Sequence, residues 1–198
     1  MKIFRTFTQL PGEAPCPLPR PVAVPLPDTV LLPPKRPFFV PDHTRDCVAT
    51  LCLAFRINRL GRSIARRFAS RYYASAEVAP AVHFVARDLL AECRMQALPW
   101  SEALAFDDAL AVAPRLPEPP EVGLSVGWNV GEVAESAALP AALWEEIDAW
   151  IVQVSEHYTL RQGDLFLLPL PLRPQPVAIE TPVTVSVGGR QVLQFNVK

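Results

Sequence analysis

The sequence of Val82–Asp107, VHFVARDLLAECRMQALPWSEALAFD, decides the fold. Its first four residues are mostly apolar and predict the end of a strand. The charged stretch that begins at Arg87 predicts a helix, and Leu98–Trp100 predicts a turn before a second helical segment that ends in Ala-Phe-Asp. The other segments of the chain can be placed relative to this strand–helix–turn–helix unit.

The composition is that of an ordinary globular protein. The chain has 198 residues, of which 50% are hydrophobic and 20% charged, with a net charge of −1. One domain with a sizeable core is the simplest expectation. The charge balance gives no reason to expect a nucleic acid or an anionic membrane as a partner. The apolar runs 47–55 and 166–172 are too short to span a bilayer, and residues 1–7 precede no apolar signal segment, so we expect a cytoplasmic protein.

The cysteines predict free thiols. There are four of them, Cys16, Cys47, Cys52 and Cys93, with no Cys-x-x-Cys pair and no zinc-finger spacing. In a reducing compartment such residues stay unpaired, and those in apolar surroundings behave as small hydrophobic side chains.

Proline is the unusual feature of the composition, with 23 residues concentrated in segments 11–41, 113–120 and 169–176. Because proline lacks a backbone N–H and disfavours helix, the first cluster predicts an extended or edge-strand segment. We therefore divide the chain into a proline-rich N-terminal arm, residues 1–41, and a domain, residues 42–198. A proline-rich ligand for another protein is the alternative for the arm.

Residues 46–57 (DCVATLCLAFRI) predict a buried strand, because the run is apolar and bounded by polar turns. Side chains alternate between the two faces of a strand. Thr50 and Cys52 therefore share one face, and Cys47 and Leu51 lie on the other.

The remaining segments indicate an α+β fold. Few helices among many strands, without regular strand–helix alternation, favour this class over a doubly wound sheet. The expected helices are 62–74, which is amphipathic, and 140–155. The expected strands are 1–7 and a pair, 122–128 and 131–135, around a turn at Asn129. Segment 160–168 is expected to turn at Gly163-Asp164 into a buried strand, and a terminal hairpin, 182–187 and 192–197, is joined by Gly188-Gly189.

The order of these segments resembles the fumarylacetoacetate hydrolase family in its shorter, single-domain form. The similarity extends from about Pro27 to the end of the chain. It rests on PDTVLL (27–32), PFFVPD (37–42), RINRLGRSIARRFASRYY (56–73), ARDLLAEC (86–93), LPW (98–100), AFD (105–107), YTLRQGDL (158–165) and a terminal hairpin ending in FNVK.

This resemblance implies a rolled or barrel-like mixed β-structure that forms homodimers. It also implies Mg²⁺- or Mn²⁺-dependent hydrolysis, decarboxylation or isomerisation of acylpyruvate-type and other β-dicarbonyl substrates. In this family the metal polarises the substrate carbonyl, and a lysine and loop amides stabilise the developing charge.

The family's functional positions carry different residues here. Its Glu-x-Glu metal-binding pair falls on Thr50 and Cys52, and its third carboxylate falls on His83. The position of its lysine, three residues before Asp107, is Leu104. A hard divalent cation prefers anionic oxygen ligands, so these residues predict that no such metal is held.

The family's Thr-Gly-Thr-Pro loop falls on Leu168, Pro169, Leu170 and Pro171. Two hydroxyls are thereby absent, and Pro169 has no N–H to offer to an oxyanion. The histidine that the family often has near its N-terminus has no counterpart, since residues 1–25 contain no histidine. The metal, lysine and oxyanion positions have therefore all changed together.

Other roles for these residues remain open at this stage. Cys52 and His83 are good zinc ligands, but a zinc site needs more, which His43 or Asp107 would have to supply. The alternative is that Cys52 and His83 fill apolar space, with His83 hydrogen-bonded to a neighbour. We expect Arg87 and Asp88 to hold the turn and the helix that follow them.

The sequence therefore predicts a degenerate family member, a pseudoenzyme without catalytic or metal-binding residues. Its expected role is structural or regulatory, as a homodimer or as the partner of an active relative. One alternative is an enzyme with an altered site that acts on small keto acids. Another is a module that binds a small molecule.

Overall fold

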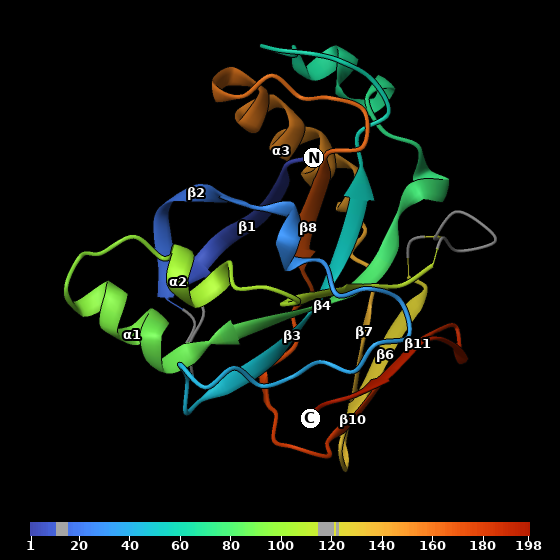
Figure 1. Ribbon diagram of the computed structural model, residues 1–198. Coiled ribbons are helices and arrows are strands. Elements are labelled where there is room, and N and C mark those ends of the chain that lie inside the picture. The colour runs from blue at the N-terminus through green and yellow to red at the C-terminus, as the bar shows by residue number, and fades with distance from the viewer. Residues whose placement is uncertain (11–15, 115–120, 122) are drawn as a thin grey trace.

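The computed structural model describes residues 1–10, 16–114, 121 and 123–198 (Figure 1). Two β-sheets and a small number of helices make up these residues, so the predicted α+β class is confirmed. Neither sheet closes into a barrel in the described part of the chain. None of the helices found there is long and apolar enough to cross a membrane.

The larger sheet has seven strands in the order β2-β1-β8-β3-β4-β5, with β9 paired to β3. Its strands are β1 (Ile3–Leu10), β2 (Cys16–Leu26), β3 (Cys47–Arg56), β4 (Ala79–Ala86), β5 (Leu110–Val112), β8 (Leu165–Pro169) and β9 (Gln175–Pro176). The N-terminal residues 1–41, which we assigned to an arm, thus supply two strands of this sheet.

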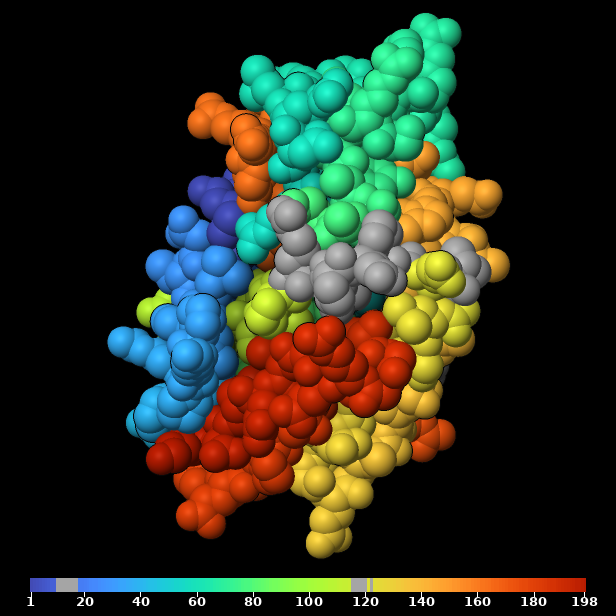
Figure 2. All heavy atoms as spheres, turned by 90° about the vertical axis from the view of Figure 1, so that its right-hand side faces the viewer, coloured from blue at the N-terminus to red at the C-terminus, as the bar shows by residue number. Residues whose placement is uncertain are grey.

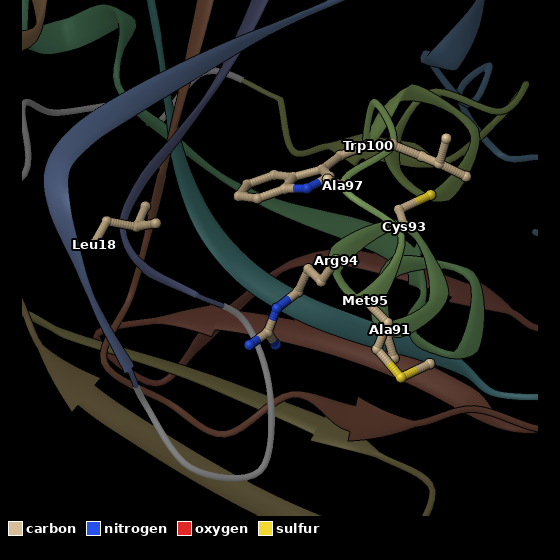
Figure 3. A pocket seen from close by; sticks show the side chains of 8 residues that line it. Leu18, Ala91, Cys93, Arg94, Met95, Ala97 and Trp100 are labelled. Carbon is tan, nitrogen blue, oxygen red and sulfur yellow. The ribbon is translucent and has the colours of Figure 1, made fainter.

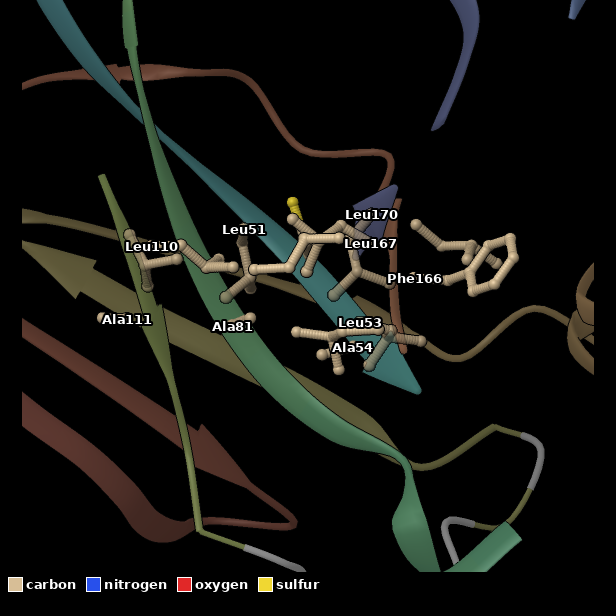
Figure 4. Packing of buried hydrophobic residues seen from close by; sticks show 14 of the residues in the cluster. Leu51, Leu53, Ala54, Ala81, Leu110, Ala111, Phe166, Leu167 and Leu170 are labelled. Carbon is tan, nitrogen blue, oxygen red and sulfur yellow. The ribbon is translucent and has the colours of Figure 1, made fainter. Parts of the chain in front are cut away.

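Strand β3 is the centre of the larger sheet, as its apolar sequence predicts. It pairs antiparallel with β4, β8 and β9. Its residues from Cys47 to Phe55 are buried, which means that both of its faces are covered. Figure 4 shows side chains from β3, β4, β5 and β8, such as Leu51 and Leu167, packed together along it.

The smaller sheet has the order β11-β10-β6-β7 and is antiparallel throughout. Its strands are β6 (Ser125–Val130), β7 (Val133–Ala138), β10 (Pro182–Val187) and β11 (Arg190–Asn196). The terminal hairpin is confirmed, because Gly188 and Gly189 have φ of +55° and +81° and make its turn. The turn between β6 and β7 includes Gly131 (φ +58°), so the expected turn at Asn129 is wrong.

The terminal hairpin also holds the segment that leads into β3. Phe38 pairs with Val197, and the Val40 N–H donates to the Lys198 carbonyl at 2.8 Å. Figure 2 shows the C-terminal strands, in red, directly beside this light-blue segment. The ring of Phe38 stacks on Phe84 of β4, so the contact extends into the larger sheet.

The predicted strand–helix–turn–helix unit is confirmed as β4, α1 (Arg87–Met95) and α2 (Ser101–Leu104). The predicted C-terminal helix is α3 (Leu143–His157). Its apolar stripe is buried as expected and consists of Leu143, Ile147, Trp150, Ile151 and Val154. Short 3₁₀ turns are η1 (Asp28–Val30), η2 (Arg66–Arg71) and η3 (Ser75–Glu77).

The amphipathic α-helix expected over 62–74 is wrong, because only the 3₁₀ turn η2 forms there. Ser63 has a φ of +49°, which is incompatible with a right-handed helix. The Ser63 N–H donates to the Ser155 carbonyl, and the Ile64 N–H donates to the Ser155 hydroxyl. Docking on α3 therefore overrides the local helical periodicity.

Asp164 joins the start of the chain to β8. It is 1% exposed, and its carboxylate accepts hydrogen bonds from the backbone N–H groups of Lys2 (2.9 Å) and Arg161 (2.8 Å). The Lys2 ammonium lies 2.6 Å from the same carboxylate. These bonds fix the point at which β1 enters the sheet in parallel to β8.

Replacing Asp164 with alanine should lower the free energy of unfolding by about 3 kcal/mol, because it leaves the lysine charge and two N–H donors without an acceptor. Equilibrium urea unfolding measures the change. The exposed Asp42→Ala is the matched control and should change stability by no more than about 0.5 kcal/mol. Equal effects of the two substitutions would show that the Asp164 bonds do not hold β1.

Candidate functional site

The register of the larger sheet brings the predicted site positions together. Thr50 on β3 lies directly opposite His83 on β4, and Cys52 lies opposite Pro169 on β8. Directly paired residues point to the same face of a sheet, and so do residues two apart on one strand. Thr50, Cys52, His83 and Pro169 therefore share one face, as the sequence predicts for the first two.

His83 is fully buried and bonded to the main chain of α2. Its Nε2 lies 2.9 Å from the carbonyl oxygen of Leu104. A carbonyl only accepts, so we assign the proton of the neutral ring to Nε2, which leaves Nδ1 with a lone pair and no partner. Burial and the nearby Arg5 charge lower the pKa of His83 from 6.5 to about 3. The expected hydrogen bond of His83 to a neighbour is thus present, and its partner is Leu104.

Cys52 is a protonated thiol in this position. It is completely buried, and its Sγ lies 3.6 Å from the Thr50 carbonyl, to which it donates. Burial raises the pKa of Cys52, and the charge of Arg5 opposes this effect only partly. Metal binding would require the thiolate, which this environment disfavours.

Arg5 is a buried charged residue at this face that the sequence analysis missed. It pairs with Leu167 on β8, which in turn pairs with Ala54 on β3, so Arg5 lies on the face of Cys52. Its side chain is 2% exposed, and its guanidinium lies 4.9 Å from the ring centroid of Phe7. Its Nη1 donates to the Thr6 carbonyl at 3.2 Å, and its Nε has no partner.

The sequence did carry a signal for Arg5. In Ile3-Phe4-Arg5-Thr6-Phe7 the apolar residues occupy both parities, which is typical of a strand buried on both faces. Such a strand forces Arg5 inside the protein. The family resemblance starts only near Pro27, so it drew no attention to residues 3–7.

The positions expected to bind an oxyanion, Pro169 and Leu170, offer no free N–H group. Pro169 has no N–H, and the Leu170 N–H donates to the Leu51 carbonyl at 3.0 Å. The Leu172 N–H donates to the Leu170 carbonyl at 2.8 Å. These backbone donors are used within the fold, so they are not available for oxyanion stabilisation.

The expected structural role of Arg87 and Asp88 agrees with their contacts. Arg87 binds the Asp46 carboxylate in a bidentate way, with distances of 2.6 and 2.9 Å. Asp88 accepts hydrogen bonds from the Thr44 hydroxyl and the backbone N–H groups of Arg45 and Leu89. Slight burial raises the pKa of Asp88, but these hydrogen bonds lower it further, and the net pKa lies below its usual value.

These residues do not fit a divalent cation. Within the described residues, no three His, Cys, Asp or Glu side chains are placed to hold one metal ion. His43 and Asp107 therefore do not complete a site with Cys52 and His83. At the predicted positions stand a hydroxyl, a buried thiol and a neutral imidazole. The guanidinium of Arg5 would in addition repel a cation placed beside Cys52 and His83.

Comparison with known proteins identifies the family. The model of the fumarylacetoacetate (FAA) hydrolase C-terminal domain matches residues 3–169. The chain belongs to this family. Its match to the mitochondrial oxaloacetate tautomerase FAHD1 of Bos taurus is 27% identical over 177 residues, covering 87% of this chain and 78% of that protein. The FAHD1 protein of Homo sapiens is 26% identical over 186 residues, covering 91% and 82%.

Solved structures share the fold. Fumarylpyruvate hydrolase from Pseudomonas aeruginosa, crystallised with Mn²⁺ and pyruvate, superposes with a TM-score of 0.84 at 17% identity, covering 100% of this chain and 89% of that one. A fumarylacetoacetate hydrolase family protein from Yersinia pestis CO92 has a TM-score of 0.83 at 19% identity, covering 100% and 92%. Both confirm the family fold expected from the sequence.

The low pKa of His83 predicts an acid-sensitive fold. The unfolded state binds a proton below the ordinary pKa of 6.5, whereas the folded state does so only below about 3. Stability is therefore full above pH 6.5 and falls as the pH drops towards 3. Between pH 7.5 and pH 5.0 the loss due to His83 should be about 2 kcal/mol.

Urea unfolding at these two pH values measures the effect. In His83→Asn, whose amide can still donate to the Leu104 carbonyl, the loss on acidification should be about 2 kcal/mol smaller than in the wild type. The exposed His157→Asn is the control and should keep the wild-type pH dependence. A His83→Asn profile identical to the wild type would mean that His83 is not buried as a neutral ring.

Proposed function

We propose that this chain is a family member that does not perform the metal-dependent reaction of its relatives. Its role is structural or regulatory, as a homodimer or as the partner of an active relative. The observation that carries this proposal is the charge of the site. Three positions that hold carboxylates in the family are neutral here, and a buried guanidinium, Arg5, lies on the same face.

Electrostatics makes a divalent cation much less stable at this site than at a site built from carboxylates. A divalent cation is held by carboxylates that compensate its charge and its lost hydration. Here the charge that acts on Cys52 and His83 from a neighbouring strand is that of Arg5, which is positive, and at low local dielectric its repulsion of a second cation is strong. Thr50 offers a hydroxyl and Cys52 a thiol, so the cation would gain no anionic ligand from them.

The remaining catalytic elements are absent as well. Leu104 is buried and carries no charge to stabilise an enolate, and the loop at Pro169 and Leu170 has no free N–H donor. Loss of one such donor commonly slows an enzyme by a factor of about 100 to 1,000. Loss of the metal, the lysine and the loop donors together leaves none of the groups on which the family mechanism depends.

An enzyme with an altered site, acting on a small keto acid, is the second candidate. It is favoured by the retained fold and by the retained corner at Arg87 and Asp88, which holds β4 against β3. The relatives named above are an oxaloacetate tautomerase and a fumarylpyruvate hydrolase. Such an enzyme would have to work with Arg5 and His83. A cytoplasmic location remains a prediction of the sequence.

Calorimetric titration with Mg²⁺, Mn²⁺ and Zn²⁺, together with elemental analysis of the purified protein, tests the main proposal. We expect less than 0.1 metal ion per chain and no heat of binding. Fumarylpyruvate hydrolase from Pseudomonas aeruginosa, which was crystallised with Mn²⁺, is the control for metal binding when prepared in the same way. Stoichiometric binding of any of the three ions, abolished by Cys52→Ala, would exclude the proposal.

Oligomeric state is tested separately by sedimentation. We expect a dimer at micromolar concentration, independent of added metal. A monomer would leave the absence of metal chemistry unaffected and would remove the homodimer from the proposal.

A further inference from the structure

We propose that a basic hollow between the turn 33–36 and the C-terminal residues binds a small molecule that carries a phosphate group. The described residues that line it are Lys35, Arg36, Pro37, Gln194, Phe195, Asn196 and Lys198. Its volume is about 350 Å³, which is at the lower end of the range of ligand pockets in proteins. The proposal does not rest on the proposed function, because the hollow shares no residue with the face of Thr50, Cys52 and His83.

The first observation is the charge of the hollow. Lys35, Arg36 and Lys198 are exposed cations that line it, and no Asp or Glu of the described chain does so. Among the described residues, none of the three cations has a carboxylate partner. Glu180 reaches this region through its backbone N–H, which donates to the Val197 carbonyl, and its carboxylate does not line the hollow.

Three cations around one small hollow repel one another, and an anion bound between them offsets that repulsion. Their side chains contribute a charge of +3. A carboxylate at the end of the main chain would lower this sum to +2, which still calls for an anion with two charges.

The second observation is the backbone of Lys35. The Arg36 N–H donates to the Pro33 carbonyl at 3.2 Å and closes a turn. Pro34 takes the second position of this turn and Lys35, with a φ of +67°, takes the third. Glycine or asparagine is favoured there, so the lysine is strained. Strain of this kind concentrates at ligand-binding positions, and here it places a cation at the rim of the hollow.

The third observation is that the backbone of both walls is held in place. Pro34 and Pro37 fix φ on either side of the two cations of the turn. The Phe38 N–H donates to the Asn196 carbonyl at 3.0 Å, and the Lys198 N–H donates to the Phe38 carbonyl at 2.7 Å. Figure 2 shows the two walls side by side, one in light blue and the other in red. Fixed walls reduce the entropy that is lost on binding.

A phosphate group matches these donors better than a carboxylate does. Arg36 presents a planar fork that can bind two oxygens of a phosphate, and the lysines act as point charges beside it. Gln194 and Asn196 carry side-chain amides, which can donate further hydrogen bonds. A phosphate monoester has a charge of about −2 and three acceptor oxygens, whereas a carboxylate has one charge and two oxygens. Pro37 and Phe195 supply an apolar surface for the organic part of the ligand.

The larger surface hollow does not offer this set of groups. Its volume is about 720 Å³, and it lies between β2 and the α1–α2 unit (Figure 3). In Figure 3 the side chains of Trp100 and Arg94 project from α1–α2 towards β2, where Leu18 lies. Arg94 is the one cation among its described lining residues, and the others are apolar. A cluster of cations is therefore a property of the smaller hollow.

Isothermal titration calorimetry of the full chain with pyrophosphate tests the proposal, with citrate as the carboxylate probe. We expect pyrophosphate to bind in a one-to-one ratio and about ten-fold more tightly than citrate, because its oxygens match the fork of Arg36. Raising the salt concentration from about 50 to 200 mM should weaken the binding several-fold, since the cations are exposed to solvent. Metal-free buffer keeps the result separate from the question of metal binding.

Variants identify the cations. Lys35→Gly removes one charge and relaxes the left-handed backbone. Its Tm should therefore equal or exceed that of the wild type, while its affinity for pyrophosphate falls about five-fold. Arg36→Gln should lower the affinity about ten-fold, because the fork is lost. The exposed Arg62→Gln is the matched control outside the hollow and should keep the wild-type affinity.

Each of four results would overturn the proposal. The first is a wild-type chain that does not bind pyrophosphate, and the second is one that binds citrate equally well. The third is wild-type affinity in either Lys35→Gly or Arg36→Gln. The fourth is an equal loss of affinity in Arg62→Gln, which would show that pyrophosphate binds to exposed arginines in general and not to the hollow.

Discussion

The antiparallel pairing of β3 with β4 is the constraint on which the site depends. It runs without a bulge from Cys47–Ala86 to Ala54–Ala79, and it fixes which side chains meet. A slip of one residue would move Thr50 and Cys52 to the opposite face. The Arg87–Asp46 ion pair and the bonds to Asp88 close one end of this pair of strands, so its register is set by several contacts at once.

Much of the fold could be predicted from the sequence where one periodic pattern dominates. The strand 46–57, the terminal hairpin and the helix that ends near His157 were predicted within a few residues, because burial there follows a simple alternation or stripe. The absence of an α-helix over 62–74 could not be predicted, because the backbone there is hydrogen-bonded to Ser155 on α3. A tertiary contact of this kind leaves no local pattern.

Some residues of the candidate site could likewise be predicted from the sequence, and others could not. The shared face of Thr50 and Cys52 follows from strand parity, and the position of His83 opposite Thr50 follows from pairing along the sheet. Arg5 depends on a parallel pairing between β1 and β8, which are separated by more than 150 residues. The apolar pattern of residues 3–7 indicates that Arg5 is buried, but no short-range rule predicts that it lies beside β8 and on the face of Cys52.

The sign of the charge on the face of Thr50, Cys52 and His83 determines which ions this face can hold. Carboxylates around a metal form a site that polarises a carbonyl, because the metal is a Lewis acid with open positions. The guanidinium of Arg5, near a protonated thiol and a neutral imidazole, offers no open coordination position and repels a cation. Leu104 is buried and uncharged, so it cannot stabilise a developing negative charge. The chain therefore keeps the fold of the family, while the charge near Cys52 and His83 has the sign that disfavours a cation.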